Sequence, residues 1–469
     1  MNHSLGRVFI VGIGGAGMSA LAKLLLAQGA QVSGSDAKDS RRLQALSATG
    51  IEVHIGHDAN HLLDSNGNAA FDTIAASTAV PASNPELVKA KELGLRLLDR
   101  AQLLCEVTDN FEVASIAGTH GKTTTTSMLT LALQSAGLDP SFAIGSELNE
   151  SGSNAHLGSG KVFVVEADES DGTFLKLDTK IAVITNVEPD HLNYWQTYEK
   201  LEAAFVEFAR NTLKNHGRAV ICIDDEGGKK LAASALSEGV GVATYGQSPE
   251  ADYQIKLIDH LNFGWRFQVF HQEVLVLEAE LKVPGVHNVL NATAAAVAAL
   301  SIGASSKDIS AGLEMFSGTR RRFEFKGRAN GISVYDDYAH HPTEIAATLR
   351  AAREVVGDGR LVVAFQAHHY YRTALFSREF GQALALADEV VVLEVYAPGE
   401  EFIAGSSGQT LADNVDLDKA HVVFEPSWSK VASHLVDRAK TGDIIMTLGA
   451  GEIGLLCSEI LEKISDKKS

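Results

Sequence analysis

The chain has 469 residues and a formal net charge of −19 at pH 7, and 45% of its residues are hydrophobic. This length predicts about three domains of ordinary size. The acidic balance excludes a general nucleic-acid-binding surface, which needs basic residues to displace phosphate counterions. Three scattered cysteines exclude a disulfide framework, and no apolar run reaches the roughly 20 residues needed to cross a bilayer. We therefore expect a soluble, cytoplasmic protein with no nucleic-acid partner and no membrane insertion.

The first predicted unit begins with an apolar strand over 8–11 and a turn with the pattern Gly12-x-Gly14-x-x-Gly17. A helix to about Gln28 and a second strand over 31–35 follow, and Asp36 ends that strand. Such a turn places the start of a helix against phosphate groups and is typical of a Rossmann-like domain. By itself the pattern is compatible with a dinucleotide, another nucleotide diphosphate or a purely structural turn.

A second combination of strand, glycine turn and helix begins at the apolar strand 113–117 and continues as Gly118-Thr119-His120-Gly121-Lys122-Thr123-Thr124-Thr125. In such a turn, backbone N–H groups surround phosphate oxygens, the lysine bridges the β- and γ-phosphates, and Thr123 can hold Mg²⁺. The spacing departs from the usual pattern, because Ile116 occupies the position of the first glycine. A turn that only joins the strand to a helix from Ser127 is the alternative, and we favour a nucleoside triphosphate site.

Acidic residues follow the next predicted strand, 162–166, in the run Glu166-Ala167-Asp168-Glu169-Ser170-Asp171. One or two carboxylates beside a triphosphate turn suffice for Mg²⁺ (or Mn²⁺), and Glu166 is the first candidate, while the other acids fit a solvated loop equally well. After the strand 181–185 comes the segment 186–191, which ends in His191. This histidine is a candidate ligand for a second metal ion.

Alternation of strands and helices continues to the end of the chain. A strand over 219–223, shorter strands near 252–283 and a helix at about 289–302 complete the second unit. After Gly318, strands over 361–365, 390–393, 421–424 and 444–448 are separated by helical segments. This order predicts mainly parallel sheets with ligand sites at the carboxyl ends of the strands.

Seven motifs occur in the order seen in the Mur ligases, and the resemblance covers nearly the whole chain. They are the turns at 12–19 and 118–125, the acidic run 166–171, the segment 186–191, His287-Asn288-Val289-Leu290-Asn291, Arg321-Arg322-Phe323, and Asp336-Asp337-Tyr338-Ala339-His340-His341-Pro342. The resemblance implies an α/β fold of three domains. These are a Rossmann-like UDP-sugar domain (1–110), a central P-loop ATPase-type α/β domain (111–318) and a Rossmann-like α/β domain for the amino acid (319–469).

The resemblance also implies roles for individual residues. It places the UDP-sugar on Gly14, Gly15, Ala16, Gly17, Asp36, Ser77 and Thr78, and ATP on Gly118, Thr119, His120, Gly121, Lys122, Thr123, Thr124, Asn288, Asn291, Arg322 and Asp337. Metal ligands would be Thr123, Glu166 and His191, and further substrate contacts Tyr338, His341, His368 and Arg372. The catalytic candidates are Lys122, His191, Arg322 and His340. Either of the two histidines is a candidate general base.

The segment 365–373 resembles the amino-acid-binding loop, in which the guanidinium of Arg372 would meet a carboxylate. This chain has Ala367 and His369 where many family members have proline and arginine, so the resemblance does not fix the detailed contacts of the carboxylate. The segment 202–207 has no lysine, and we expect no carbamylated lysine.

The expected activity is the ATP-dependent joining of L-alanine to the lactyl carboxylate of UDP-N-acetylmuramic acid through an acyl phosphate. The related alternative is a recycling ligase that attaches the tripeptide L-alanyl-γ-D-glutamyl-meso-diaminopimelate to the same UDP-sugar. A dehydrogenase would leave Lys122 and Glu166 without a task, and a non-catalytic nucleotide switch would leave the segment around Arg372 unexplained. We expect a monomer or a weak homodimer.

Overall fold

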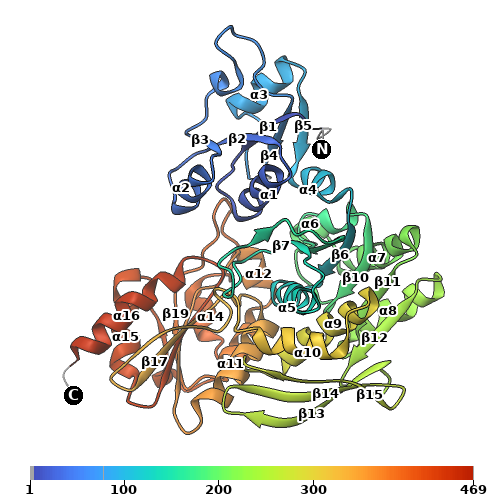
Figure 1. Cartoon of the computed structure of the whole chain (residues 1–469). Coiled ribbons are helices and arrows are strands. Elements are labelled where there is room, and N and C mark those ends of the chain that lie inside the picture. Colours follow the sequence, from blue (N-terminus) through green and yellow to red (C-terminus); the bar gives the residue numbers. More distant parts are fainter. Residues whose placement is uncertain (1–4, 78, 468–469) are drawn as a thin grey trace. The chain divides into compact units, whose positions relative to one another are not determined.

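The computed structural model of the chain describes residues 5–77 and 79–467. Its strands form three sheets (Figure 1), and the chain divides into two compact units. The first unit comprises Met1–Ile255, Val269–Leu277 and Asn291–Leu313, and the second comprises Lys256–Gln268, Glu278–Leu290 and Glu314–Ser469. The three domain boundaries expected from the sequence stay a prediction, because the division between the two units falls within single strands and helices.

The first sheet is parallel, in the order β3-β2-β1-β4-β5. Its elements are β1 (Arg7–Val11), α1 (Ala16–Ala27), β2 (Gln31–Asp36), α2 (Arg41–Ala48), β3 (Glu52–Ile55), β4 (Thr73–Ala76), α3 (Pro85–Glu92), β5 (Arg96–Asp99) and α4 (Arg100–Thr108). Residues of β1 alternate between the two faces, so that Val8 and Ile10 join the cluster of α1 and α4 while Phe9 and Val11 join that of α3. This is the Rossmann-like arrangement predicted for the start of the chain.

The second sheet contains the order β12-β11-β10-β6-β9-β7-β8 and continues from β12 through β13, β14 and β15. Its strands are β6 (Glu112–Ala117), β7 (Ser141–Ala143), β8 (Ala155–His156), β9 (Val162–Glu166), β10 (Thr179–Ile184), β11 (Arg218–Cys222), β12 (Val242–Gly246), β13 (Tyr253–Leu261), β14 (Gly264–His271) and β15 (Val274–Leu281). The division between the two units falls within the last three strands.

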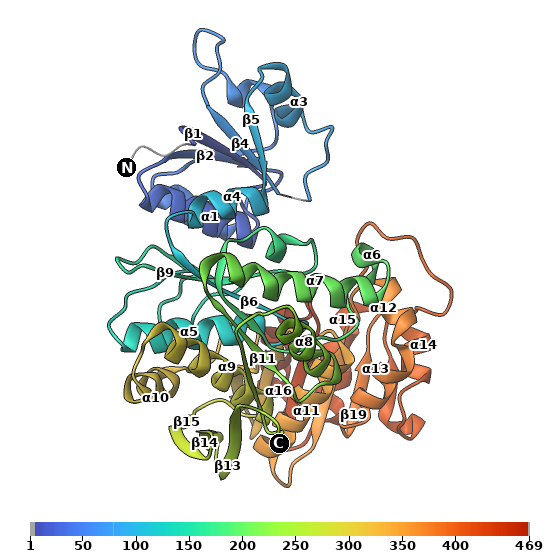
Figure 2. The same ribbon diagram turned by 90° about the vertical axis from the view of Figure 1, so that its right-hand side faces the viewer.

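Helices cover both faces of this second sheet. They are α5 (Lys122–Ser135), α6 (Leu192–Trp195), α7 (Tyr198–Asn211), α8 (Glu226–Ser237), α9 (Val286–Ile302) and α10 (Ser306–Met315). Figure 2 shows α7 and α8 together, and their apolar residues share one core cluster with alternate residues of β9, β10 and β11. On α10, Gly312 allows close packing on α5, since a Cβ there would lie 2.6 Å from the backbone of Ala132.

The third sheet has the order β16-β17-β21-β18-β19-β20 and is parallel except for the β16 and β17 pair. Its strands are β16 (Glu324–Ala329), β17 (Ile332–Asp337), β18 (Leu361–Phe365), β19 (Glu389–Val392), β20 (Val422–Phe424) and β21 (Ile444–Leu448). The helices α11 (Pro342–Val356), α13 (Ser377–Leu384) and α14 (Gly408–Asp413) cover one face, and α15 (Trp428–Arg438) and α16 (Leu456–Asp466) cover the other. The short α12 (Tyr370–Leu375) follows β18.

The predicted α/β class and the mainly parallel sheets are confirmed. One start differs, because α5 begins at Lys122 instead of Ser127. The hydroxyl groups of Thr126 and Ser127 donate to the carbonyls of Lys122 and Thr123 one turn earlier in this helix, at 2.8 and 2.7 Å. Within the described residues, no helix combines the length and apolar character that a membrane crossing requires.

Candidate functional site

The turn between β6 and α5 has a shape that only glycine permits at two positions. Gly118 and Gly121 have φ angles of 128° and 82°, and a Cβ at Gly121 would lie 2.4 Å from Oδ1 of Asn291. The side chain of Asn186 accepts the N–H of His120 at 2.8 Å and donates to the carbonyl of the same residue at 3.0 Å. The turn is therefore held rigidly at the start of α5, where backbone N–H groups favour a phosphate group.

A hydroxyl and a carboxylate meet in the first turn of α5. The Oγ1 of Thr123 lies 3.0 Å from both carboxylate oxygens of Glu166, and the N–H of Gly145 donates to Oε2 of Glu166 at 2.8 Å. Hard oxygen donors of this kind fit Mg²⁺, which keeps several of its waters beside a bound triphosphate. The structure thus brings together two of the three predicted metal ligands.

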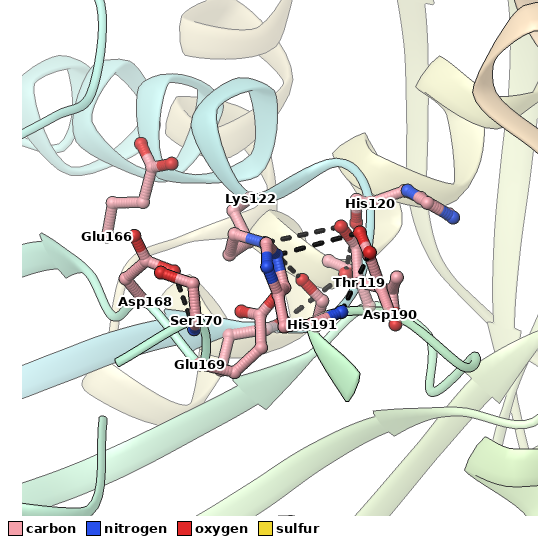
Figure 3. A network of polar contacts seen from close by, with 12 residues as sticks. Thr119, His120, Lys122, Glu166, Asp168, Glu169, Ser170, Asp190 and His191 are labelled. Carbon is pink, nitrogen blue, oxygen red and sulfur yellow. Dashed lines mark hydrogen bonds and ion pairs between the residues drawn. The ribbon is translucent and has the colours of Figure 1, made fainter. Parts of the chain in front are cut away.

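Lys122 points back toward the turn and the acidic run (Figure 3). Its Nζ donates to the carbonyl of Gly118 at 2.6 Å and to Oε1 of Glu169 at 2.8 Å. Burial alone would lower the pKa of Lys122, but the carboxylates of Glu169 and Asp168 raise it, so the lysine is charged. Burial raises the pKa of Glu169, and its Oε2 has no hydrogen-bond partner among the residues that the structure describes.

Glu169 belongs to this site but is not among the predicted site residues. The sequence fits a metal ligand and a residue of a solvated loop equally well at this position, yet the side chain of Glu169 is only 1% exposed. The indole N–H of Trp195 donates to the backbone carbonyl of Glu169 at 2.9 Å. The acidic run 166–171 indicates that carboxylates lie near the phosphate turn. Which of these carboxylates faces the turn depends on the direction of the loop after β9.

His191 lies beside the same carboxylate. Its Nε2 is 3.8 Å from Oε1 of Glu169 and 3.6 Å from Oδ2 of Asp190, and its backbone has a φ of 52°. The segment before it packs on the phosphate turn, since the hydroxyl of Thr119 accepts the N–H of Glu188 at 2.9 Å. Thr124 is buried in the first turn of α5. The residues predicted at the carboxyl ends of β9 and β10 therefore surround the phosphate turn between β6 and α5.

The N-terminal glycine turn is closed by side chains from β2 and α2. Oδ2 of Asp36 accepts the N–H of Gly14 at 2.8 Å, and Nη1 of Arg42 donates to the carbonyl of Gly14 at 2.8 Å. Gly15 and Gly17 are exposed, and α1 begins at Ala16. The N–H of Ser77 donates to the carbonyl of Val11 at 3.1 Å, while Thr78 lies outside the described residues.

In the second unit, Asp337 is buried at the end of β17. It accepts the N–H groups of Phe323 and Ala339, both at 2.7 Å. Burial raises its pKa to about 6, against the opposing effect of the nearby Arg322 guanidinium. That guanidinium lies 5.2 Å from the ring centre of Tyr338, which is the distance of a cation–π contact.

Glu344 joins the remaining candidates around the start of α11. Its carboxylate lies 3.6 Å from Nη1 of Arg322 and 3.2 Å from Nδ1 of His340. His341 caps the helix, accepting the N–H of Thr343 at 3.4 Å, and Glu344 completes this capping box. Glu344 is not among the predicted site residues, because the usual capping signal is Ser, Thr, Asp or Asn followed three positions later by glutamate or glutamine, and here a histidine caps the helix.

The remaining candidates lie on α12, just before it, and on α9. Arg372 is 1% exposed, and its Nη1 donates to the carbonyl of His368 at 3.3 Å. Burial lowers the pKa of His368 to about 4, helped by the neighbouring His369 and Arg372, so this histidine is neutral at pH 7. On α9, the side-chain amide of Asn288 donates to the carbonyl of Pro284 at 2.8 Å. Asn291 accepts from the hydroxyl of Thr125 at 3.3 Å, which places it at the base of the phosphate turn.

The three sheets are mainly parallel, and glycine turns follow the carboxyl ends of their strands, an arrangement typical of nucleotide-binding α/β proteins. Three family models match the chain: the Mur ligase family catalytic domain over 7–112, the Mur ligase middle domain over 116–299 and the Mur ligase glutamate ligase domain over 321–451. The chain belongs to the Mur ligase family.

Curated relatives and solved structures resemble it over nearly their full lengths. The chain is 52% identical to the UDP-N-acetylmuramate–L-alanine ligase of Acidothermus cellulolyticus, covering 98% of this chain and 95% of the relative. It is 49% identical to the ligase of the same name from Saccharopolyspora erythraea, covering 98% and 94%. The crystal structure of the UDP-N-acetylmuramate-alanine ligase from Thermotoga maritima matches with a TM-score of 0.81 at 29% identity, covering 98% of this chain and 100% of that one. A murein peptide ligase from Psychrobacter arcticus matches with a TM-score of 0.71 at 26% identity, covering 99% and 100%.

Proposed function

We propose that this protein is the ligase that joins L-alanine to the lactyl carboxylate of UDP-N-acetylmuramic acid at the expense of ATP, in peptidoglycan precursor synthesis. The observation that carries the proposal is the 52% identity to a UDP-N-acetylmuramate–L-alanine ligase along 98% of the chain. The pairing of Thr123 with Glu166 at 3.0 Å beside a rigid phosphate turn supports the ATP-dependent part of it.

In the proposed reaction the lactyl carboxylate attacks the γ-phosphorus of ATP, which gives an acyl phosphate and ADP. The α-amine of L-alanine, entering deprotonated, then attacks the acyl carbon, and inorganic phosphate leaves as the amide forms. Lys122 would leave the carbonyl of Gly118, which it contacts at 2.6 Å, to meet the charge on the transferring phosphoryl group. By the family resemblance, Arg322 is assigned the same task.

Thr123 and Glu166 would hold a magnesium ion, which when bound neutralises charge on the phosphates. His191 is proposed as a further ligand, and its position beside Glu169 adds that carboxylate to the candidates. His191 would accept the amine proton if it does not bind the metal, and otherwise His340 would. Each lies next to a carboxylate that can orient the ring: Glu169 for His191, and Glu344 for His340.

The UDP-sugar is assigned to the N-terminal turn, with the diphosphate at Gly14, Gly15, Ala16 and Gly17, where α1 begins. Because the proposed substrates are a sugar nucleotide and ATP, we place the reaction in the cytoplasm.

The test is phosphate release from Mg-ATP and UDP-N-acetylmuramic acid, with L-alanine, glycine, L-serine or the tripeptide L-alanyl-γ-D-glutamyl-meso-diaminopimelate in separate reactions. The proposal requires release that depends on the UDP-sugar and is fastest with L-alanine. Release in the tripeptide reaction but in none of the amino-acid reactions would identify a recycling ligase and refute the proposal. Mass spectrometry of the product, showing the UDP-sugar with one alanine added and one water lost, completes the assignment.

A further inference from the structure

One carboxylate connects the loop after β19 to the start of α12. Oε2 of Glu400 accepts the backbone N–H of Tyr370 at 2.8 Å, and Oε1 of Glu400 pairs with Nδ1 of His369. Both side chains are largely buried, with 26% of Glu400 and 29% of His369 exposed. A charged acceptor in this setting makes hydrogen bonds stronger than those between neutral groups.

The backbone on either side of this contact is also paired. The N–H of Tyr396 donates to the carbonyl of Ala367 at 2.9 Å, and the N–H of His369 donates to the carbonyl of Tyr396 at 3.1 Å. These segments leave the neighbouring parallel strands β18 and β19, so the bonds extend the sheet pairing past the ends of both strands. The ring of Phe402, 63% exposed, meets that of Tyr370 with their centres 5.4 Å apart.

The residue bound by Glu400 has a strained backbone. His369 has a φ of 74°, which residues with a side chain rarely adopt, and α12 begins at the next residue. Such a conformation persists only where the surroundings hold it, and strain of this kind gathers at ligand-binding sites. The carbonyl of His369 also accepts the hydroxyl of Thr373 at 2.9 Å, so the direction of this residue sets the first turn of the helix.

We propose that Glu400 is a positioning residue for the amino-acid substrate. Acting through His369 and the N–H of Tyr370, it fixes the turn that presents Arg372, whose side chain donates to the carbonyl of His368 at 3.3 Å. The inference rests on the proposed function, since it concerns the L-alanine site of that ligase. It also gives a role to His369, whose Nδ1 pairs with this carboxylate.

The test compares Glu400→Gln with Glu401→Gln in the full-length protein. Glu401 is the matched control because it is adjacent, carries the same charge and is exposed. For Glu400→Gln the KM for L-alanine should rise about tenfold, as expected when charge-assisted hydrogen bonds to one carboxylate become neutral ones. The KM values for Mg-ATP and UDP-N-acetylmuramic acid should stay within about twofold, because neither ligand is assigned to this turn. Glu401→Gln should match the wild type in all three.

Two substitutions of the partner separate positioning from a general loss of structure. His369→Ala should raise the KM for L-alanine as Glu400→Gln does. The KM for L-alanine of His369→Arg should be at least about threefold lower than that of His369→Ala, since arginine can pair with the same carboxylate. Equal KM values for Glu400→Gln and Glu401→Gln would overturn the inference, as would a rise in all three KM values together with a lower melting temperature. A wild-type protein without L-alanine-dependent phosphate release would instead refute the proposed function.

Discussion

The Nζ of Lys122 lies 2.8 Å from Oε1 of Glu169, and this ion pair is buried, with 14% and 1% of the two side chains exposed. The lysine of the phosphate turn is therefore already charged and already partnered before any nucleotide is considered. A triphosphate would have to compete with Glu169 for this lysine, and the exchange of one anionic partner for another costs less than the desolvation of a free ammonium group.

Lys122→Ala should reduce UDP-sugar-dependent phosphate release by about a hundred- to a thousandfold, the range for losing one preorganised donor to a transition state. The affinity for UDP-N-acetylmuramic acid, measured by isothermal titration calorimetry, should change by no more than a few-fold, because the assigned sugar-nucleotide turn lies in a different sheet. Full activity in this variant would contradict the mechanism. A double variant, Lys122→Ala with Glu169→Gln, serves as the control for the unpaired buried carboxylate.

Glu166→Gln should raise the concentration of Mg²⁺ needed for half-maximal phosphate release by about tenfold or more, since the amide supplies a weaker ligand for a hard cation. Thr123→Val should act in the same direction, because it removes the hydroxyl that lies 3.0 Å from the carboxylate. Thr123→Ser retains that hydroxyl and should keep the Mg²⁺ requirement of the wild type. An unchanged Mg²⁺ titration for both Glu166→Gln and Thr123→Val would show that the metal is held elsewhere.

Gly121→Ala should destabilise the protein more than Gly137→Ala. The two glycines have similar φ angles, 82° and 71°, so they share the cost of placing alanine in the left-handed region, about 1–2 kcal/mol. A Cβ at Gly121 would also lie 2.4 Å from Oδ1 of Asn291, whereas nothing lies within 4 Å of one at Gly137. The measurement is the melting temperature of each variant together with the KM for ATP, which only Gly121→Ala should raise. Equal losses in both would mean that Asn291 moves aside at no cost.

Acid should destabilise the protein partly through His287. Burial, with the Arg322 charge nearby, lowers the pKa of this histidine from 6.5 to about 4. Between these values the unfolded chain binds a proton that the folded chain does not, so stability falls as the pH drops from 6.5 toward 4, by at most about 1.4 kcal/mol per pH unit for one group. The melting temperature of His287→Asn should therefore fall less over this interval than that of the wild type. His216→Asn, at an exposed position, is the control and should follow the wild type.

The sequence by itself determined the parts of the site that are contiguous. The turn at Gly118 to Thr123 combines strand, glycines, lysine and hydroxyl in one short segment, so local rules of backbone conformation sufficed to predict a glycine turn between a strand and a helix, although the helix begins at Lys122 and not at Ser127. Glu166 and Asn186 were expected at one edge because carboxyl ends of parallel strands lie side by side, and the structure places β6 between β9 and β10. The α/β class followed in the same way from the alternation of apolar strands and helices.

Only the tertiary structure decided which members of each polar run face inward. Glu169 lies within the predicted acidic run, yet its pairing with Lys122 joins residues 47 positions apart and depends on the turn taken after β9. Glu400 reaches His369 across 31 positions through the packing of two neighbouring strand ends. No local pattern encodes these pairs, because the partner of a buried charge is set by the direction of a loop, and that direction depends on contacts with the rest of the fold.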